Sequence, residues 1–141
     1  MNLTTSMIVL AILAAAPAPA EGSPLLGRWR TAERGGVIEL YRCQAAVCGR
    51  LIDAAPLHAN PDQRDVRNPN ADLRARRLKN LVILTNFTGG PSKWTGASLY
   101  DPNTGNSAST GTLTLSGPDQ LTVKGCVASI FCRTQIWTRL R

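Results

Sequence analysis

The feature that most constrains the fold is a series of short apolar and β-branched runs, separated by clusters of Gly, Pro, Asn and Asp. Runs of this length and composition are typical of β-strands, and the clusters between them supply the backbone angles that chain reversals need. Consecutive strands are therefore expected to pair antiparallel. We expect strands at residues 25–31, 36–43, 47–53, 81–87, 93–100, 106–115, 120–126 and 130–140.

Eight antiparallel strands in a chain of 141 residues indicate a single all-β domain. An eight-stranded up-and-down barrel closes on itself and leaves no exposed sheet edge, so it is the architecture that we expect. A sandwich of two sheets is the alternative.

One long segment, residues 54–80, interrupts the strand pattern and carries six of the 16 Lys and Arg residues. It is too long for a simple turn. Asn68 can cap a helix and Pro69 suits the first helical position, so we expect a short helix over the residues that follow. Leu73 and Leu78 are expected to hold this helix across one end of the barrel as a lid.

The first twenty residues indicate a signal peptide. Their apolar run, residues 7–16, is shorter than a membrane-spanning helix, and Ala18 and Ala20 place small side chains before a cleavage point at Glu21. We therefore expect residues 1–20 to be removed and residues 21–141 to form the β-barrel domain. The mature protein is expected to be periplasmic or secreted and to have no transmembrane segment.

The four cysteines form two close pairs in the sequence. Disulfides persist in the oxidising compartments to which an exported protein is sent. Each pair brackets a short segment between two expected strands, and a hairpin brings facing Cβ atoms close enough for a disulfide, so local pairing is favoured. A four-cysteine zinc site is the alternative. The expected disulfides are Cys43–Cys48 and Cys126–Cys132.

Several motifs cover nearly all of the expected mature chain: they include Gly27-Arg-Trp29, Cys48-Gly-Arg-Leu-Ile52, Asp65-Val-Arg-Asn68-Pro69, Trp94-Thr-Gly96, Tyr100-Asp-Pro102 and the stretch from Cys132 to Arg139. Together they resemble the domain-of-unknown-function 2147 family of small exported bacterial proteins. The sequence departs from the family at Asn80, where a glycine is usual, and at Ala108, where a tyrosine is usual. The family has no established activity, so the resemblance implies export and a lipocalin-like β-barrel but no reaction.

Two motifs at the ends of the expected barrel also resemble the closure of calycin barrels. Gly27-x-Trp29 opens the first strand, and Trp137-Thr-Arg139 lies in the last. In calycins an arginine covers the first-strand tryptophan, and stacking of a guanidinium group on an indole ring contributes about 0.5 to 2 kcal/mol. We expect Trp29, Trp137 and Arg139 to close one end of the barrel, which is a structural role.

Catalytic and metal-binding patterns are missing from the sequence. His58 is the only histidine, so a three-histidine metal site cannot form and a Ser-His-Asp triad would depend on this residue alone. Asn68, Asn70 and Asp72 have the spacing of calcium ligands, but Lys79 stands where a bidentate glutamate is needed. We therefore expect no enzyme activity, no cofactor and no metal.

Polar and aromatic residues of the expected barrel wall are the candidate ligand-binding groups. Alternation places Arg133 and Gln135 on one face of the last strand, and Glu39 and Tyr41 on one face of the second. Pointing inward, they would form a small polar pocket; pointing outward, they would be ordinary cross-strand pairs. The candidates for ligand binding are Glu39, Tyr41, Trp94, Tyr100, Arg133 and Gln135.

These observations favour a non-enzymatic binding module that holds a small or amphipathic ligand in the barrel or under the long loop. The alternative is an interaction or inhibitor protein that binds an anionic envelope surface through the basic residues of 62–79, in a chain of net charge +7. That loop also contains acidic residues, as an ordinary solvated surface does. Nucleic acid is not an expected partner, because export separates the protein from the genome and no aromatic residues interleave with the arginines.

Overall fold

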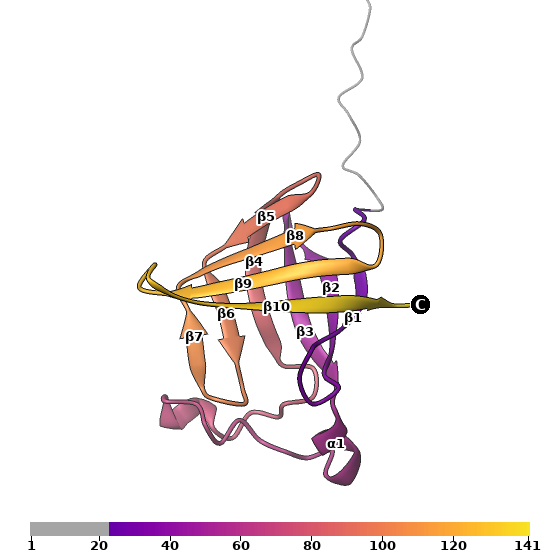
Figure 1. Ribbon diagram of the computed structural model, residues 1–141. Helices are drawn as coiled ribbons and strands as arrows, with labels where there is room; N and C mark the ends of the chain where they lie inside the picture. Colours follow the sequence, from indigo (N-terminus) through magenta and orange to yellow (C-terminus); the bar gives the residue numbers. More distant parts are fainter. Residues whose placement is uncertain (1–22) are drawn as a thin grey trace, which may run out of the picture.

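The computed structural model describes residues 23–141, so the expected signal peptide lies outside the described residues. Ten strands and two short helices follow one another along this part of the chain (Figure 1). In chain order they are β1 (Gly27–Arg30), β2 (Val37–Cys43), β3 (Ala46–Asp53), α1 (Ala55–Ala59), the 3-10 helix η1 (Ala71–Leu73), β4 (Val82–Gly89), β5 (Lys93–Gly96), β6 (Ser98–Asp101), β7 (Asn106–Ala108), β8 (Thr110–Leu115), β9 (Gln120–Val127) and β10 (Phe131–Leu140).

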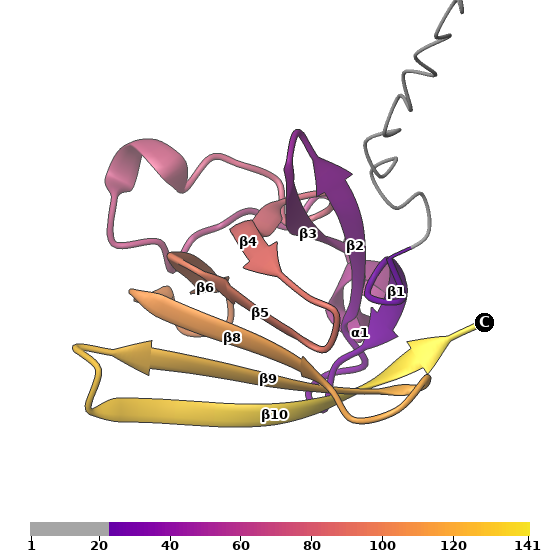
Figure 2. The ribbon, with the colours of Figure 1, turned by 90° about the horizontal axis from the view of Figure 1, so that it is seen from above.

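The strands form one closed antiparallel barrel. Hydrogen bonding runs in the order β3-β2-β1-β10-β9-β8-β5-β4, and β3 pairs with β4 to complete the ring. Figure 2, which looks at the barrel from above, shows these strands around a common axis. The β6–β7 hairpin extends the wall beyond β5 and β8, and β6 pairs with β4. The chain runs along the wall of the barrel eight times, so the predicted eight-stranded barrel is confirmed.

Two of these eight passes are bent, and each consists of two strands. β5 and β6 are separated at Ala97, and β7 and β8 at Ser109, so the expectation of unbroken strands over 93–100 and 106–115 is wrong. β4 carries a matching irregularity at Asn86, whose φ is +56°, between the residues that pair with β6 and those that pair with β5. The bend lets β4 follow both strands.

A buried phenylalanine occupies the inside of this bend. Phe87 is fully buried, and its ring lies against the backbone of Gly96 and of the paired Gly111. A Cβ atom on either glycine would come within 2.6 Å of the ring. Glycine at these two positions therefore lets the aromatic ring pack directly on the two strands.

One end of the barrel is closed by a stacked pair from the first and last strands. The Arg139 guanidinium carbon lies 4.2 Å from the centroid of the buried Trp29 ring. Arg139 also donates hydrogen bonds to the carbonyl oxygens of Leu26 at 3.0 Å and Pro118 at 2.7 Å. The stacking expected from the calycin-like motifs is thus present. Trp137, expected to take part, instead lines a cavity from its position two residues before Arg139 in β10.

Both expected disulfides are present, and the described residues contain no free cysteine. Cys43–Cys48 links β2 to β3 beside their turn, and Cys126–Cys132 joins directly paired residues of β9 and β10. Because the sulfur atoms are bonded to each other, they are not available as the zinc ligands of the alternative interpretation.

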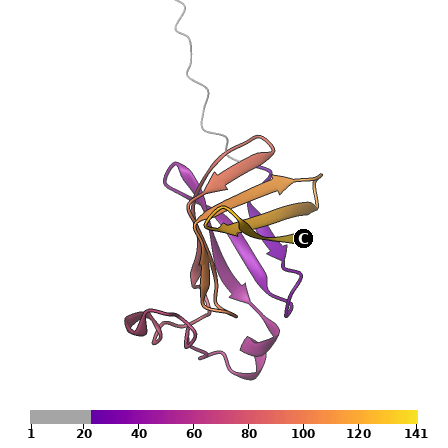
Figure 3. The same cartoon turned by 60° about the vertical axis from the view of Figure 1, so that its left-hand side comes forward.

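The long loop connects β3 to β4 at the bottom of Figure 1 and Figure 3. The helix expected after Pro69 is only the single turn η1, and its cap is Asn70 instead of Asn68, with the Asn70 side chain accepting from the Asp72 amide. Helix α1, whose Leu57 is buried in the core, was not predicted from the sequence. Leu78 also packs against the core.

Candidate functional site

A cavity of about 390 Å³ occupies the end of the barrel where the long loop lies. We call this the open end; residues of the loops 31–36, 54–81 and 102–105 line the cavity. Most of the cavity wall is apolar. Side chains from the barrel and from the long loop contribute to it, among them Ile38, Leu57, Leu78, Leu99, Val123 and Trp137.

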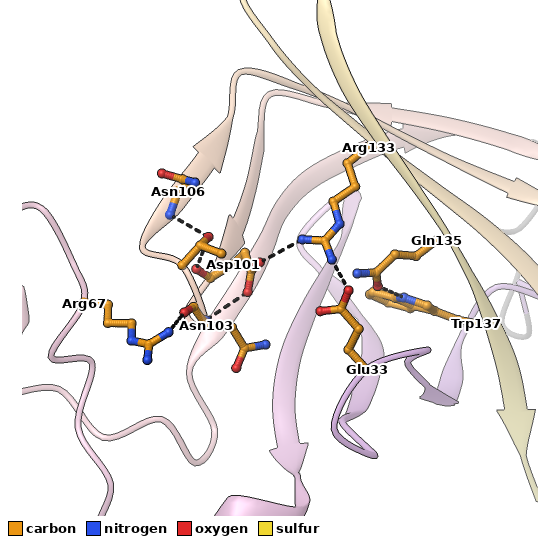
Figure 4. A network of polar contacts seen from close by, with 9 residues as sticks. Glu33, Arg67, Asp101, Asn103, Asn106, Arg133, Gln135 and Trp137 are labelled. Atoms are coloured by element: carbon orange, nitrogen blue, oxygen red, sulfur yellow. Dashed lines mark hydrogen bonds and ion pairs between the residues drawn. The ribbon is translucent and has the colours of Figure 1, made fainter.

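An ion-pair network crosses the mouth of this cavity (Figure 4). Arg133, on β10, donates a hydrogen bond to Glu33 of the β1–β2 loop, and its Nη1 lies 3.6 Å from Oδ2 of Asp101 at the end of β6. The three side chains are between 33% and 56% exposed. Ion pairs in water contribute about 0 to 1 kcal/mol, so this closure of the mouth is a weak one.

A hydrogen-bond donor lies beside the network. Gln135 accepts a hydrogen bond at 2.9 Å from the indole Nε1 of Trp137, which fixes the orientation of its amide group. Its amide nitrogen makes no hydrogen bond to another described residue, and Gln135 and Trp137 both line the cavity. The cavity therefore combines an apolar wall with a guanidinium group and an amide N–H near its mouth.

The β6–β7 turn holds Asp101 at the mouth. The Asp101 carboxylate accepts a hydrogen bond at 2.9 Å from the Asn103 amide, and the carbonyl of Asn103 accepts one from Arg67 of the long loop. Gly105 has a φ of +78°, and a Cβ atom there would lie 2.0 Å from the Arg67 carbonyl oxygen. Glycine thus permits the turn and the long loop to pack backbone against backbone.

A buried carboxylate anchors the long loop to the barrel. Asp65 is 1% exposed and accepts hydrogen bonds from the Tyr100 hydroxyl of β6, from Arg76 at 2.7 Å and from Asn68 at 3.0 Å. The backbone of Asp65 also donates to the Arg76 carbonyl at 2.9 Å. These contacts satisfy a buried charge, which would otherwise be strongly unfavourable.

The same contacts shift two pKa values. Burial raises the pKa of Asp65, but the hydrogen bonds from Tyr100, Arg76 and Asn68 outweigh this effect and hold the pKa below its ordinary value of 3.8. Burial raises the pKa of Tyr100 from 10.0 to about 12, and the neighbouring Asp65 charge adds to the shift. The ionised carboxylate and the neutral phenol are therefore the forms that stabilise the fold at neutral pH.

Three of the six candidate ligand-binding residues border the cavity. Tyr100, Arg133 and Gln135 do so, while Glu39, Tyr41 and Trp94 do not. The hydroxyl of Tyr100 already donates to Asp65, so of these three candidates Arg133 and Gln135 are the ones that can offer a polar group to a ligand.

Glu39 and Tyr41 lie on the outer face of β2, so their placement in a lumenal pocket is corrected. Arg50 of β3 donates a hydrogen bond to Glu39 at 2.9 Å, and its guanidinium carbon lies 5.0 Å from the centroid of the Tyr41 ring. Ile38 and Leu40, each 1% exposed, fill the inner face of the same strand. Burial of the two aliphatic side chains fixes which face of the strand points inward.

Trp94 and Tyr100, both predicted to bind a ligand, border different cavities. Trp94 is buried in the core and borders a separate hollow of about 300 Å³, together with Phe87 and the 88–91 turn. Ser23 and Pro24 also line this hollow, and Arg139 donates a hydrogen bond to the Pro24 carbonyl, so the hollow lies near the end that Arg139 closes. Trp94 is therefore a core residue and does not contribute to the open-end cavity.

Arginines of the basic loop are largely engaged within the protein. Arg76 pairs with Asp65 and Arg77 with Asp62, while Arg64 and Arg74 donate to backbone carbonyls of the loop itself. His58 is exposed on α1 and pairs with Asp53 at 2.9 Å; this hydrogen bond is the largest cause of the lowered pKa of Asp53. The arrangement does not favour a dedicated anion-binding surface on residues 62–79.

Within residues 23–141, no group of three or more His, Cys, Asp or Glu side chains is arranged to hold a metal ion. Over the same residues, the helices are too short and too polar to cross a membrane.

Comparisons with known proteins give a family and one structure of similar fold. The family model described as an uncharacterized protein conserved in bacteria (DUF2147) matches residues 27–139. A solved structure described as protein HP1028 from the human pathogen Helicobacter pylori, which belongs to the lipocalin family, is 20% identical, covers 83% of each chain and superposes with a TM-score of 0.72. None of the curated proteins matches the chain.

Proposed function

The chain belongs to the DUF2147 family, and we propose that it is an exported, non-enzymatic binding protein that holds a small amphipathic ligand in its barrel. The apolar part of the ligand would occupy the cavity, and its polar end would lie at the mouth beside Arg133 and Gln135. The observation that carries the proposal is the apolar cavity of about 390 Å³ at the open end, within the size range of small-molecule sites.

The polar groups at the mouth suit a ligand end that accepts hydrogen bonds. The guanidinium group of Arg133 and the amide nitrogen of Gln135 are both donors. Because the ion pairs of Arg133 with Glu33 and Asp101 are half-exposed, a ligand can replace them at small cost. A carboxylate or another anionic group at the end of an apolar ligand would therefore be bound best.

Export to the periplasm or the cell exterior is part of the proposal. The two disulfides, both close to hairpin turns, support it, because such bonds persist in oxidising compartments. The bacterial origin of the matched family is in keeping with it.

A fluorescence titration tests the proposal. The probe is 1-anilinonaphthalene-8-sulfonate, an aromatic anion that becomes fluorescent in apolar surroundings. The wild-type protein is expected to bind one probe molecule per chain with saturation. Ala108→Trp, which places a large ring on the cavity wall, is expected to lower the affinity at least tenfold.

The matched control is Thr134→Trp, which adds the same ring to an exposed position of β10 that does not line the cavity. Its affinity is expected to equal that of the wild type, with circular dichroism showing that both variants are folded. Equal binding by the two tryptophan variants would place the probe outside the cavity and contradict the proposal.

A further inference from the structure

The β9–β10 hairpin ends in an exposed apolar tip, which consists of Val127, Ile130 and Phe131. The exposed fractions are 47% for Val127, 77% for Ile130 and 75% for Phe131. The tip lies at the left-hand end of the hairpin in Figure 1, and two of its residues, Val127 and Phe131, line the open-end cavity. We propose that this tip inserts into the surface of an anionic lipid bilayer.

The strands of the tip are paired up to the turn. Phe131 pairs with Val127, and the Ile130 amide donates to the Val127 carbonyl at 3.3 Å. The Cys126–Cys132 disulfide links the next pair of residues below the tip. Insertion would therefore bury apolar side chains without exposing unpaired strand amides to lipid, and it would cost little ordering of the chain.

The charge of the hairpin complements an anionic bilayer. The whole chain carries a net charge of +7. Of the three cations in residues 120–140, Arg133 is paired with Glu33 and Asp101, and Arg139 stacks on Trp29 at the closed end, so Lys124 is the cation that can serve the tip. Lys124 is exposed on β9, three residues before Val127, which is close enough for its flexible side chain to reach the lipid headgroups when the tip is inserted. A cation near an anionic bilayer surface contributes about 1 kcal/mol.

The size and shape of the tip favour a bilayer over a second copy of the chain. A stable protein interface needs roughly 800 Å² and 20 to 30 residues from each partner. Three side chains around a hairpin turn fall far short of this. A lipid surface accepts a small convex apolar projection without needing a complementary shape.

The tip adjoins the mouth of the cavity, because Val127 and Phe131 also line it. Insertion would bring the open end of the barrel to the bilayer surface. In a further step, which rests on the proposed function, an amphipathic ligand could then pass between the bilayer and the cavity without its apolar part crossing water.

Co-sedimentation with lipid vesicles tests the proposal on the mature protein. The vesicles contain equal parts of phosphatidylglycerol and phosphatidylcholine. Ile130→Ser is the principal variant, because Ile130 is the most exposed tip residue and does not line the cavity. It is expected to raise the lipid concentration needed for half-maximal binding about tenfold. The matched control, Ile136→Ser, makes the same change at an exposed site of β10 away from the tip and is expected to bind within twofold of the wild type.

A wild-type protein that stays in the supernatant, or an Ile130→Ser variant that binds as the wild type does, would overturn the proposal. Self-association of the wild type that Ile130→Ser abolishes, measured by sedimentation velocity, would also overturn it and assign the tip to a contact between copies. Titration of Ile130→Ser with 1-anilinonaphthalene-8-sulfonate in the absence of vesicles separates the two proposals. If this variant loses lipid binding but binds the probe as the wild type does, the tip binds lipid and plays no part in probe binding.

Discussion

The hydroxyl of Tyr100, on β6, donates a hydrogen bond to the buried carboxylate of Asp65, which lies 35 residues earlier in the long loop. Through this contact the loop that covers the open end is attached to the barrel wall. The stability of the long loop, and with it the shape of the cavity, should therefore depend on the hydrogen bond between these two groups and on their protonation.

Removal of the Tyr100 hydroxyl should destabilise the protein measurably. Tyr100→Phe takes one donor from a buried carboxylate, and we expect the free energy of unfolding to fall by about 2 kcal/mol in urea titrations. Tyr41→Phe is the matched control, because Tyr41 lies on the outer face beside Arg50, and it should change stability by less than about 0.5 kcal/mol. Equal effects of the two changes would argue against the anchoring role.

The stability of the protein should decline in alkaline solution. The pKa of Tyr100 is raised from 10.0 to about 12 in the folded protein, so the folded state holds this proton more tightly than the unfolded state does. The contribution is complete below pH 10 and is lost as the pH rises toward 12. Urea titrations across this range should show the decline for the wild type and a smaller one for Tyr100→Phe.

Acid should weaken the same contact, because it protonates the Asp65 carboxylate. The pKa of Asp65 lies below 3.8 in the folded protein, so its contribution is complete above that pH and is lost as the pH falls through the folded value. Asp65→Asn should abolish this part of the acid dependence, as measured by unfolding at a series of pH values. An unchanged acid profile would assign the acid sensitivity to other carboxylates.

Closure of the barrel by Arg139 should require the planar guanidinium group. Arg139→Lys keeps the charge but loses both the stacking on Trp29 and the forked donation to Leu26 and Pro118, so we expect a loss of about 1 to 2 kcal/mol. Arg141→Lys, at an exposed surface ion pair with Asp119, should have little effect. Thermal unfolding of the two variants checks this difference.

The barrel itself could be predicted from the sequence, because its strands alternate with clusters of Gly, Pro, Asn and Asp, which are typical of turns. Gly105 and Gly117 both adopt positive φ in turns that the sequence marked, and Asn80 adopts a φ of +64° where the family usually has glycine. The cysteine pairs could be predicted as well, since short hairpins leave few other partners.

The inward face of β2 could not be assigned from alternation alone. Alternation separates Glu39 and Tyr41 from Ile38 and Leu40, but it does not state which set faces the lumen. The structure decides in favour of the aliphatic pair, while Arg50 from the neighbouring strand satisfies Glu39 outside. The decisive partner lies on another strand, where a pattern within one strand cannot reveal it.

The anchor of the long loop was missed for a related reason. Asp65 stands among arginines and other polar residues, as a solvated carboxylate would. Its burial depends on Tyr100, which is distant in the sequence, and on Arg76, which meets it only after the loop folds back. Helix α1 is equally hard to foresee, because five residues with one buried leucine show no helical periodicity.

The central claim, that the open-end cavity holds a ligand, is tested most directly by native mass spectrometry of the protein purified from the bacterial envelope. We expect the wild type and Thr134→Trp to carry one small molecule per chain, and Ala108→Trp, whose new ring fills the cavity, to carry none. A wild-type chain with no bound molecule, or the same molecule retained by Ala108→Trp, would contradict the claim.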